Sequence, residues 1–299
     1  MALPFRPSSP SPSIGPRPRR AALAVALTAA LLGMLLTAVR PAGAQIPEPP
    51  YLGPPAGFGA AETEHFRVFA EDGAAMDAGA FAIAYGSIAE RAHAELGALF
   101  PPPSAKLVLT VYADDATFAA ATRGAPRPDP LGREVLADPG VGDIALSLRR
   151  FAARSPREAE NGLRRVVAQV LLRRLARGNL PRGFDQGIAA YVERPVGQEL
   201  AKTAALLQNA RQRDDLLSWS DLNRTQPPTA EPEMVAAHAY GVVAFLVERH
   251  GLRSLTGFVS ALATEPDWRA AMRTVYQRSP GELEDQWREN LPRWTAGGW

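Results

Sequence analysis

The segment from Leu163 to Tyr191 constrains the fold more than any other, because its pattern predicts two helices joined by a Gly/Pro turn. In the first helix, apolar residues recur at the three- and four-residue spacing that places side chains on one face. Gly178 and Pro181 interrupt this pattern, and a second helix follows as far as Tyr191. We expect the apolar face of the first helix to pack into the core of a domain. Its residues are Leu163, Val166, Val167, Val170, Leu171 and Leu175.

The second helix and the turn before it resemble part of a known family. Residues 179–191 read NLPRGFDQGIAAY and are similar to the segment LPxWLxEGLAEY of the peptidase MA family, the gluzincin-type zinc metallopeptidases. The stretches 236–248, 250–251 and 281–287 resemble the C-terminal half of the same family, so that the resemblance covers residues 63–294. It implies an α+β fold with a thermolysin-like architecture. In that architecture a small twisted N-terminal β-sheet with helices precedes a mainly helical half.

The resemblance also identifies chemical groups that have been replaced. A zinc peptidase of this kind holds its ion with two His four residues apart and a Glu from the following helix, while a second Glu activates water. Here the residues from Gln169 through Val170 to Arg173 occupy the His-Glu-x-x-His positions, and Gln186 occupies the position of the third ligand. An amide is a poor zinc ligand, valine cannot transfer a proton, and a guanidinium group repels a dication. The resemblance therefore implies a degenerate site that holds no metal and no cofactor.

Four residues near these positions are candidates for lining the former cleft: Asp185, Tyr191, His238 and Tyr240. An Arg within a packed helix needs an acidic partner. We therefore expect the Arg173 guanidinium to stand where a metal charge would be and to pair with Asp185 or another nearby acid. For the His and the two Tyr, packing in the core is the alternative interpretation.

The N-terminal 62 residues predict export. Residues 21–39 form a predominantly apolar run of 19 uncharged residues, and residues 42–44 (Ala-Gly-Ala) form a small-residue cleavage pattern. Residues 1–44 are thus either a cleaved signal peptide or an N-terminal membrane anchor, and in both cases the domain lies outside the cytoplasm. Residues 45–62 contain five Pro between positions 47 and 55, which predicts a stiff extended linker.

Residues 63–295 predict the folded domain, in two halves with different patterns. In the sheet-containing half, 63–150, we expect strands at 64–71, 106–112 and 143–148 and helices at 79–100 and 113–122, the second of which Asp114 or Asp115 can cap. The half at 151–295 predicts helices alone. After the two-helix segment these span 199–213, 234–250, 252–263, 266–276 and 280–288.

Composition limits the kinds of site that the chain can form. There is no Cys, which excludes disulfides and thiolate metal sites. The His at 65, 93, 238 and 250 include no pair at four-residue spacing, so a metal site would require residues distant in sequence to converge. Five of the 33 basic residues precede the cleavage pattern, and the remaining 28 face 31 acidic ones. The exported chain therefore lacks the basic excess typical of nucleic-acid binding.

Ten Arg lie between positions 149 and 182, against two Glu in the same stretch. Pairing with acids from elsewhere in a balanced chain is one interpretation of this local excess. Binding to an anionic lipid surface beside a membrane anchor is the other.

Three functions are consistent with these patterns. The first is a catalytically inactive, metallopeptidase-like protein that binds or scaffolds an extracytoplasmic protein or peptide and meets the membrane through its N-terminal segment. The second is a hydrolase with a metal-independent site built from Asp185, Glu193 or His238. The third is a helix-rich envelope protein whose likeness to a peptidase is accidental. The first and third differ in whether the helices bearing Gln169 and Gln186 pack so that these two side chains approach each other.

Overall fold

A computed structural model of the chain describes residues 53–54, 56–102, 104–123, 133, 135–137, 140, 142–194, 197–224 and 230–296. The predicted signal peptide or anchor at 1–44, with its apolar run at 21–39, and most of the predicted linker lie outside these residues. Within the described part of the chain, no helix combines the length and apolar character needed to cross a membrane.

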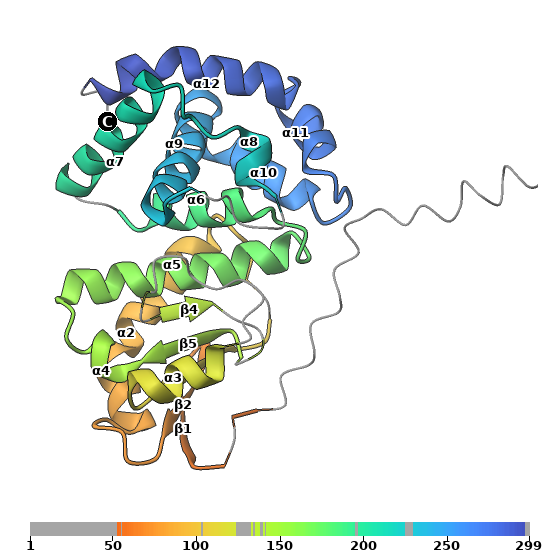
Figure 1. Ribbon diagram of the computed structural model, residues 1–299. Helices are drawn as coiled ribbons and strands as arrows, with labels where there is room; N and C mark the ends of the chain where they lie inside the picture. Colours follow the sequence, from red (N-terminus) through yellow and green to blue (C-terminus); the bar gives the residue numbers. More distant parts are fainter. Residues whose placement is uncertain are drawn as a thin grey trace, which may run out of the picture. The chain divides into compact units, whose positions relative to one another are not determined.

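A five-stranded mixed sheet forms the first half of the fold, with the strand order β1-β2-β3-β5-β4 (Figure 1). The central strands β2, β3 and β5 run parallel, while β1 and β4 pair antiparallel at the two edges. Each parallel connection passes through a helix, as such crossovers require. The strands are β1 (Phe58–Glu62), β2 (Phe66–Glu71), β3 (Leu107–Tyr112), β4 (Val135–Ala137) and β5 (Ile144–Ser147).

Helix α2 (Ala78–Gly97) packs on β1 and β2, and α3 (Asp115–Thr122) packs against β3 and β5. Asp114 caps α3 by accepting hydrogen bonds from the amides of Ala116 and Thr117, which is the cap expected from the sequence. The short helix α4 (Leu148–Phe151) follows β5 directly.

In the second half, the regular elements of the described residues are all helices. They are α5 (Pro156–Leu175), α6 (Arg182–Val192), α7 (Gly197–Gln212), α8 (Trp219–Leu222), α9 (Pro232–His250), α10 (Leu252–Ala261), α11 (Trp268–Tyr276) and α12 (Pro280–Thr295). The predicted order of a sheet-containing half followed by a mainly helical half is therefore confirmed.

Helix α5 joins the two halves (Figure 1). It begins with a capping box, in which the Ser155 side chain and Glu158 satisfy each other's backbone amides. One side of α5 contacts α2, β4 and β5, and another contacts α6. Leu163, Val166, Val167 and Leu171 are fully buried, as the apolar spacing predicts. Most of the buried apolar side chains belong to one continuous core that includes residues of both halves.

Helix α6 lies very close to α9 because residue 187 is a glycine. A Cβ built on Gly187 would stand 2.2 Å from the Ala239 carbonyl oxygen, which is backbone and cannot move aside. The turn before α6, in which Arg177 and Gly178 adopt positive φ, lets the chain reverse so that α5 and α6 pack together. The two-helix unit expected from the sequence is thus present.

The short helices α4 and α8 were not expected from the sequence, and three further elements differ from the expectations. Strand β1 lies within residues 45–62, which the sequence assigns to a linker, and pairs with β2 along its whole length. Strand β4, only three residues long, lies where the sequence shows a Gly/Pro loop. Helix α12 continues seven residues beyond the predicted end at 288, because Leu291 and Trp294 extend its buried face past Pro292.

Candidate functional site

Arg173 and Asp185 form a buried ion pair between α5 and α6. The Arg173 Nη2 donates to Asp185 Oδ2 at 2.7 Å and Nε donates to the same oxygen at 3.2 Å. The Asp185 side chain is 2% exposed and that of Arg173 is 15% exposed. The predicted pairing of Arg173 with Asp185 is therefore confirmed, and the positive charge stands on the α6 side of α5.

The ion pair belongs to a longer polar seam, which we define as Arg165, Gln169 and Arg173 of α5 with Asp185 and Glu193. The three α5 residues are spaced by four and therefore share one helical face. Arg165 lies 3.0 Å from the Glu193 carboxylate through Nε and donates to the Gln169 amide oxygen at 3.4 Å. The Gln169 amide in turn donates to Asp185 at 3.5 Å, at the limit of hydrogen bonding. Gln169, which the resemblance places at a metal-ligand position, therefore connects the Arg165–Glu193 ion pair to the Arg173–Asp185 ion pair.

The same two arginines hold the edge strand β4. Arg165 Nη2 donates to the Val135 carbonyl at 2.6 Å, and Arg173 Nη1 donates to the Ala137 carbonyl at 2.7 Å. Successive residues of a strand direct their carbonyls to opposite edges, so Val135 and Ala137, two residues apart, direct theirs to the same edge. The outward carbonyls of β4 are therefore occupied by guanidinium groups from α5. This arrangement explains how a strand of three residues is fixed in place.

The two remaining replaced positions contribute no charge. Val170 is 6% exposed and belongs to the hydrophobic core. Gln186 is half-buried, and its side-chain oxygen has no hydrogen-bond partner within the described part of the chain. Gln186, Ala190 and Glu193 lie at spacings of four and three on α6, so they share a face. Of these three, Ala190 and Glu193 line a cleft.

This cleft, of about 350 Å³, is bounded by α5, α6, α7 and α9. Its charged side chains are mixed in sign and paired. Lys202 lies 2.9 Å from Glu233, Arg154 lies 3.7 Å from Glu158, and Arg133 and Arg165 both contact Glu193. Leu200, Leu206 and Tyr240 add apolar surface. A cleft with both charge signs and an apolar strip matches the chemistry of a polypeptide segment.

The four candidate cleft residues lie in different environments. Tyr240 lines the cleft, and burial together with the neighbouring Tyr191 raises the pKa of its hydroxyl to about 12. Tyr191 is half-buried with its ring 6.2 Å from that of Tyr240, and burial raises the pKa of its hydroxyl too. Asp185 lies within the seam.

His238 is a core residue. It is fully buried, its Nε2 accepts from the Leu217 amide at 3.2 Å, and its Nδ1 lies 2.8 Å from the Met234 carbonyl. Burial lowers the pKa of this imidazole. His238 therefore connects α9 to the segment before α8, and it does not line the cleft of Tyr240.

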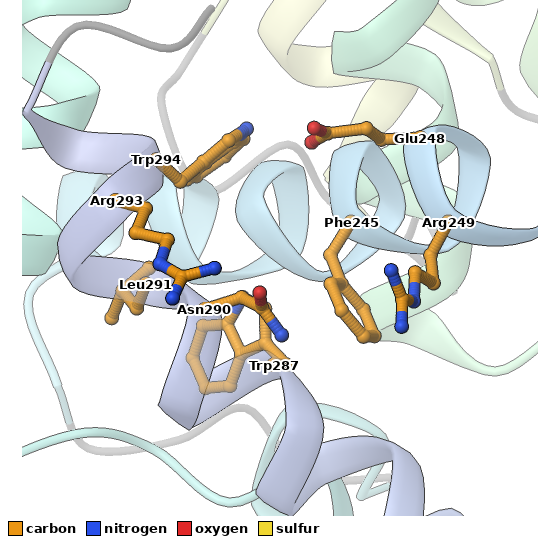
Figure 2. A pocket seen from close by; sticks show the side chains of 8 residues that line it. All are labelled: Phe245, Glu248, Arg249, Trp287, Asn290, Leu291, Arg293 and Trp294. Atoms are coloured by element: carbon orange, nitrogen blue, oxygen red, sulfur yellow. The ribbon is translucent and has the colours of Figure 1, made fainter.

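A second pocket, of about 290 Å³, lies between α9 and α12 (Figure 2). Phe245, Trp287 and Trp294 give it an aromatic lining. Figure 2 shows the Glu248 carboxylate directed toward Trp294. None of the replaced ligand positions lines this pocket, so it is separate from the polar seam.

Sequence reasoning missed the roles of Arg165 and Glu193 as the pair that joins the seam to the cleft. The sequence did contain a signal for Arg165, because this residue lies four residues before Gln169 and therefore on the same helical face. Six arginines of the cluster at 149–182 contact acids, which confirms the pairing interpretation for them. They are Arg150, Arg154, Arg164, Arg165, Arg173 and Arg174, with Asp115, Glu158, Glu95, Glu193, Asp185 and Asp143.

The structure also brings together His65, Glu90 and His93, three residues in which the sequence indicated no site. The two His come from different elements, so helical spacing alone could not reveal their convergence.

The chain matches no protein-family model, and no curated protein sequence is significantly similar to it.

Proposed function

We propose that the chain is a non-catalytic, metallopeptidase-like protein that uses the cleft between α5, α6, α7 and α9 to bind a polypeptide segment outside the cytoplasm. The observation that carries this proposal is the Arg173–Asp185 ion pair. An arginine and an acid from two adjacent helices fill the place where a peptidase of this architecture would hold a metal ion. Fixed positive charge there is incompatible with a divalent cation.

The packing of the two helices supports the proposed scaffold. The reversal before α6 places α6 against α5, and the close approach at Gly187 holds α6 against α9. Where α5 faces α6, Arg165 meets Glu193, and Gln169 meets Asp185. The cleft begins at Arg165 and Glu193, and Arg165 lies one helical turn before the first position matched to a metal ligand.

The composition of the cleft supports a peptide as the occupant. Paired charges of both signs can exchange partners with a polypeptide, whereas an excess of one sign would favour a polyanion or a polycation. The Tyr240 hydroxyl remains protonated at neutral pH and offers a hydrogen-bond donor beside apolar surface. The described residues supply what recognition needs without a group placed for catalysis.

The hydrolase alternative has weaker support. Both His238 nitrogens are engaged by backbone groups, and Asp185 and Glu193 are each held by arginine. A general base must reach its substrate, and a His with 0% exposure does not.

Restoring metal ligands tests the scaffold. One variant carries Arg165→His, Val166→Glu, Gln169→His and Gln186→Glu, and a second carries Gln169→His, Val170→Glu, Arg173→His and Gln186→Glu. We expect the second variant, which restores the positions matched by the resemblance, to bind one more zinc ion than the unmodified chain, as measured by metal analysis after dialysis. If both variants fold and neither gains an ion, the metallopeptidase-like geometry is refuted.

Blocking the cleft tests the binding role. The full chain is incubated with a pool of random-sequence peptides, and retained peptides are identified by mass spectrometry. Ala236→Trp fills the cleft, and we expect it to abolish retention. Ala152→Trp adds the same side chain at an exposed position on the C-cap of α4 and should leave retention unchanged. Equal retention by both variants would exclude the cleft as the binding site.

A further inference from the structure

His65, Glu90 and His93 converge where the start of β2 meets α2. His65 immediately precedes β2, and the other two residues lie three apart on α2. Gly86, Glu90 and His93 share a helical face at spacings of four and three. A Cβ on Gly86 would come within 3.1 Å of the Thr63 methyl group, so the glycine allows this part of the chain to approach α2.

Glu90 is fixed in position by its surroundings. Its Oε1 accepts hydrogen bonds from the Thr63 hydroxyl at 2.5 Å and from the His65 amide at 2.8 Å. Its Oε2 lies 2.7 Å from His65 Nδ1. One oxygen is therefore used to anchor the carboxylate, and the other faces the imidazole. Anchoring of this kind is typical of carboxylates that coordinate or orient ligands at metal centres.

His93 differs from His238, the other buried histidine among the described residues, in its hydrogen bonding. It is 4% exposed, and within the described residues neither ring nitrogen has a hydrogen-bond partner. Its contacts are ring contacts, with His65 stacked at 4.2 Å between centroids and Phe66 edge-on at 5.9 Å. His238, by comparison, uses both nitrogens. The His93 nitrogens are therefore not engaged by the described residues and can act as ligands.

We propose that His65, Glu90 and His93 bind a divalent transition-metal ion, with zinc the best match. Two imidazoles and one carboxylate are a donor set that zinc takes in proteins. One ligand atom from each of the three residues lies within 4.8 Å of the others. Tetrahedral zinc with bonds of about 2.0–2.1 Å needs its ligand atoms roughly 3.4 Å apart. Binding through His65 Nδ1 and Glu90 Oε2, which lie 2.7 Å apart, therefore requires these two atoms to separate slightly so that the ion replaces their hydrogen bond.

His65 is the residue that can move. Its side chain is 42% exposed, whereas that of Glu90 is 23% exposed. Rotation of His65 brings its ring nitrogen toward an ion held by Glu90 and His93, and its exposed side gives the ion a path from solvent. The bound ion fastens the start of β2 to α2, and its fourth position is filled by water. This site is independent of the proposed peptide-binding cleft, because the two share no residue.

Metal titration of the full chain tests the site. After treatment with a chelator and its removal, the chain is titrated with Zn²⁺ by calorimetry and with Co²⁺ by visible absorption. We expect one equivalent to bind and the Co²⁺ form to show the strong absorption of a tetrahedral site. Zinc should also raise the melting temperature.

Three substitutions and one matched control assign the ligands. His65→Asn, His93→Phe and Glu90→Gln should each raise the dissociation constant by about 10- to 100-fold or more. Glu64→Gln removes the same charge beside His65, from a side chain that is 81% exposed, and should change the constant less than about twofold, since surface charges act weakly.

Two results would overturn the proposal. One is the absence of a bound equivalent in the unmodified chain. The other is equal weakening by Glu64→Gln and Glu90→Gln, which would indicate diffuse attraction to surface charge. His65→Asn keeps the test decisive even if His93→Phe fails to fold, because position 65 is exposed. Repeating the ligand restoration in the cleft on a His65→Asn background separates the two metal measurements.

Discussion

Two of the regions that bury polar groups in this protein, the polar seam and the junction of β2 with α2, differ in how they satisfy those groups. In the polar seam between α5 and α6, Arg165 and Arg173 contact both an acid and a β4 carbonyl. At the junction of β2 and α2, the His93 imidazole is buried without a hydrogen bond from the described residues. In the first region the buried arginines and acids neutralise one another. In the second, two imidazoles and a carboxylate converge without a cationic side chain among them, which is why we assign an ion to it and none to the seam.

The largest change in stability is expected when one member of the Arg173–Asp185 ion pair is removed. Arg173→Met leaves the Asp185 carboxylate buried beside an apolar side chain, and we expect a loss of about 3–5 kcal/mol in the free energy of unfolding. Urea denaturation measures it. Arg174→Met is the matched control, because its pair with Asp143 is more exposed and should contribute roughly 0–1 kcal/mol. If both variants lose the same free energy of unfolding, the buried ion pair contributes no more to stability than the more exposed one.

Replacing both members of the ion pair should recover most of that loss. In Arg173→Met with Asp185→Leu, no uncompensated charge remains, and stability should return to within about 2 kcal/mol of the unmodified chain. The same urea measurement, together with Asp185→Leu alone, completes a double-mutant cycle. If the double variant is as unstable as the sum of the single ones, the two residues do not act as a pair.

A smaller effect should appear as the pH is lowered, through His238. Burial lowers the pKa of His238 in the folded protein, so the unfolded chain binds the proton more readily. The stability supplied by the neutral imidazole is complete above about pH 6.5 and declines below it by up to about 1.4 kcal/mol per pH unit, until the folded-state pKa is reached. Urea midpoints between pH 7.5 and 5 should fall less steeply in His238→Gln. Parallel pH profiles would contradict this role.

The smallest effect is expected at His93. Without added metal, His93→Leu removes a buried polar ring that has no hydrogen bond within the described chain, so unfolding free energy should stay within about 1 kcal/mol or rise. Thermal denaturation in the presence of a chelator measures this. A loss of several kcal/mol would show that His93 has a structural partner, and the contrast between the two regions would disappear.

Much of the fold could be predicted from sequence because its signals are local. The apolar spacing of α5, the Asp114 cap and the Gly251 end of α9 depend on neighbouring residues. Strand β4 could not be predicted, since three residues carry little pattern and its position depends on Arg165 and Arg173, about thirty residues away. The start of α5 was readable in the sequence Ser155-Pro156-Arg157-Glu158, although the apolar pattern suggested a later beginning.

The candidate site was partly predictable for the same reason. The Arg173–Asp185 pair follows from charge and helix packing, whereas the cluster of His65 with His93 depends on how β2 registers against α2. The spacing of residues along the sequence does not reveal how β2 is positioned against α2. The burial of His238 away from the cleft likewise depends on the rotation of α9, which Gly187 and Leu207 determine through close contacts at Ala239 and Gly241.

The two guanidinium groups on β4 also have a consequence for how this protein meets other chains. An open strand invites a neighbouring polypeptide to extend the sheet, and natural proteins commonly prevent this with charge. Here the outward carbonyls of Val135 and Ala137 already accept hydrogen bonds from α5. Intermolecular growth of the sheet, including the first step of fibril formation, is therefore blocked on that side for as long as α5 stays folded.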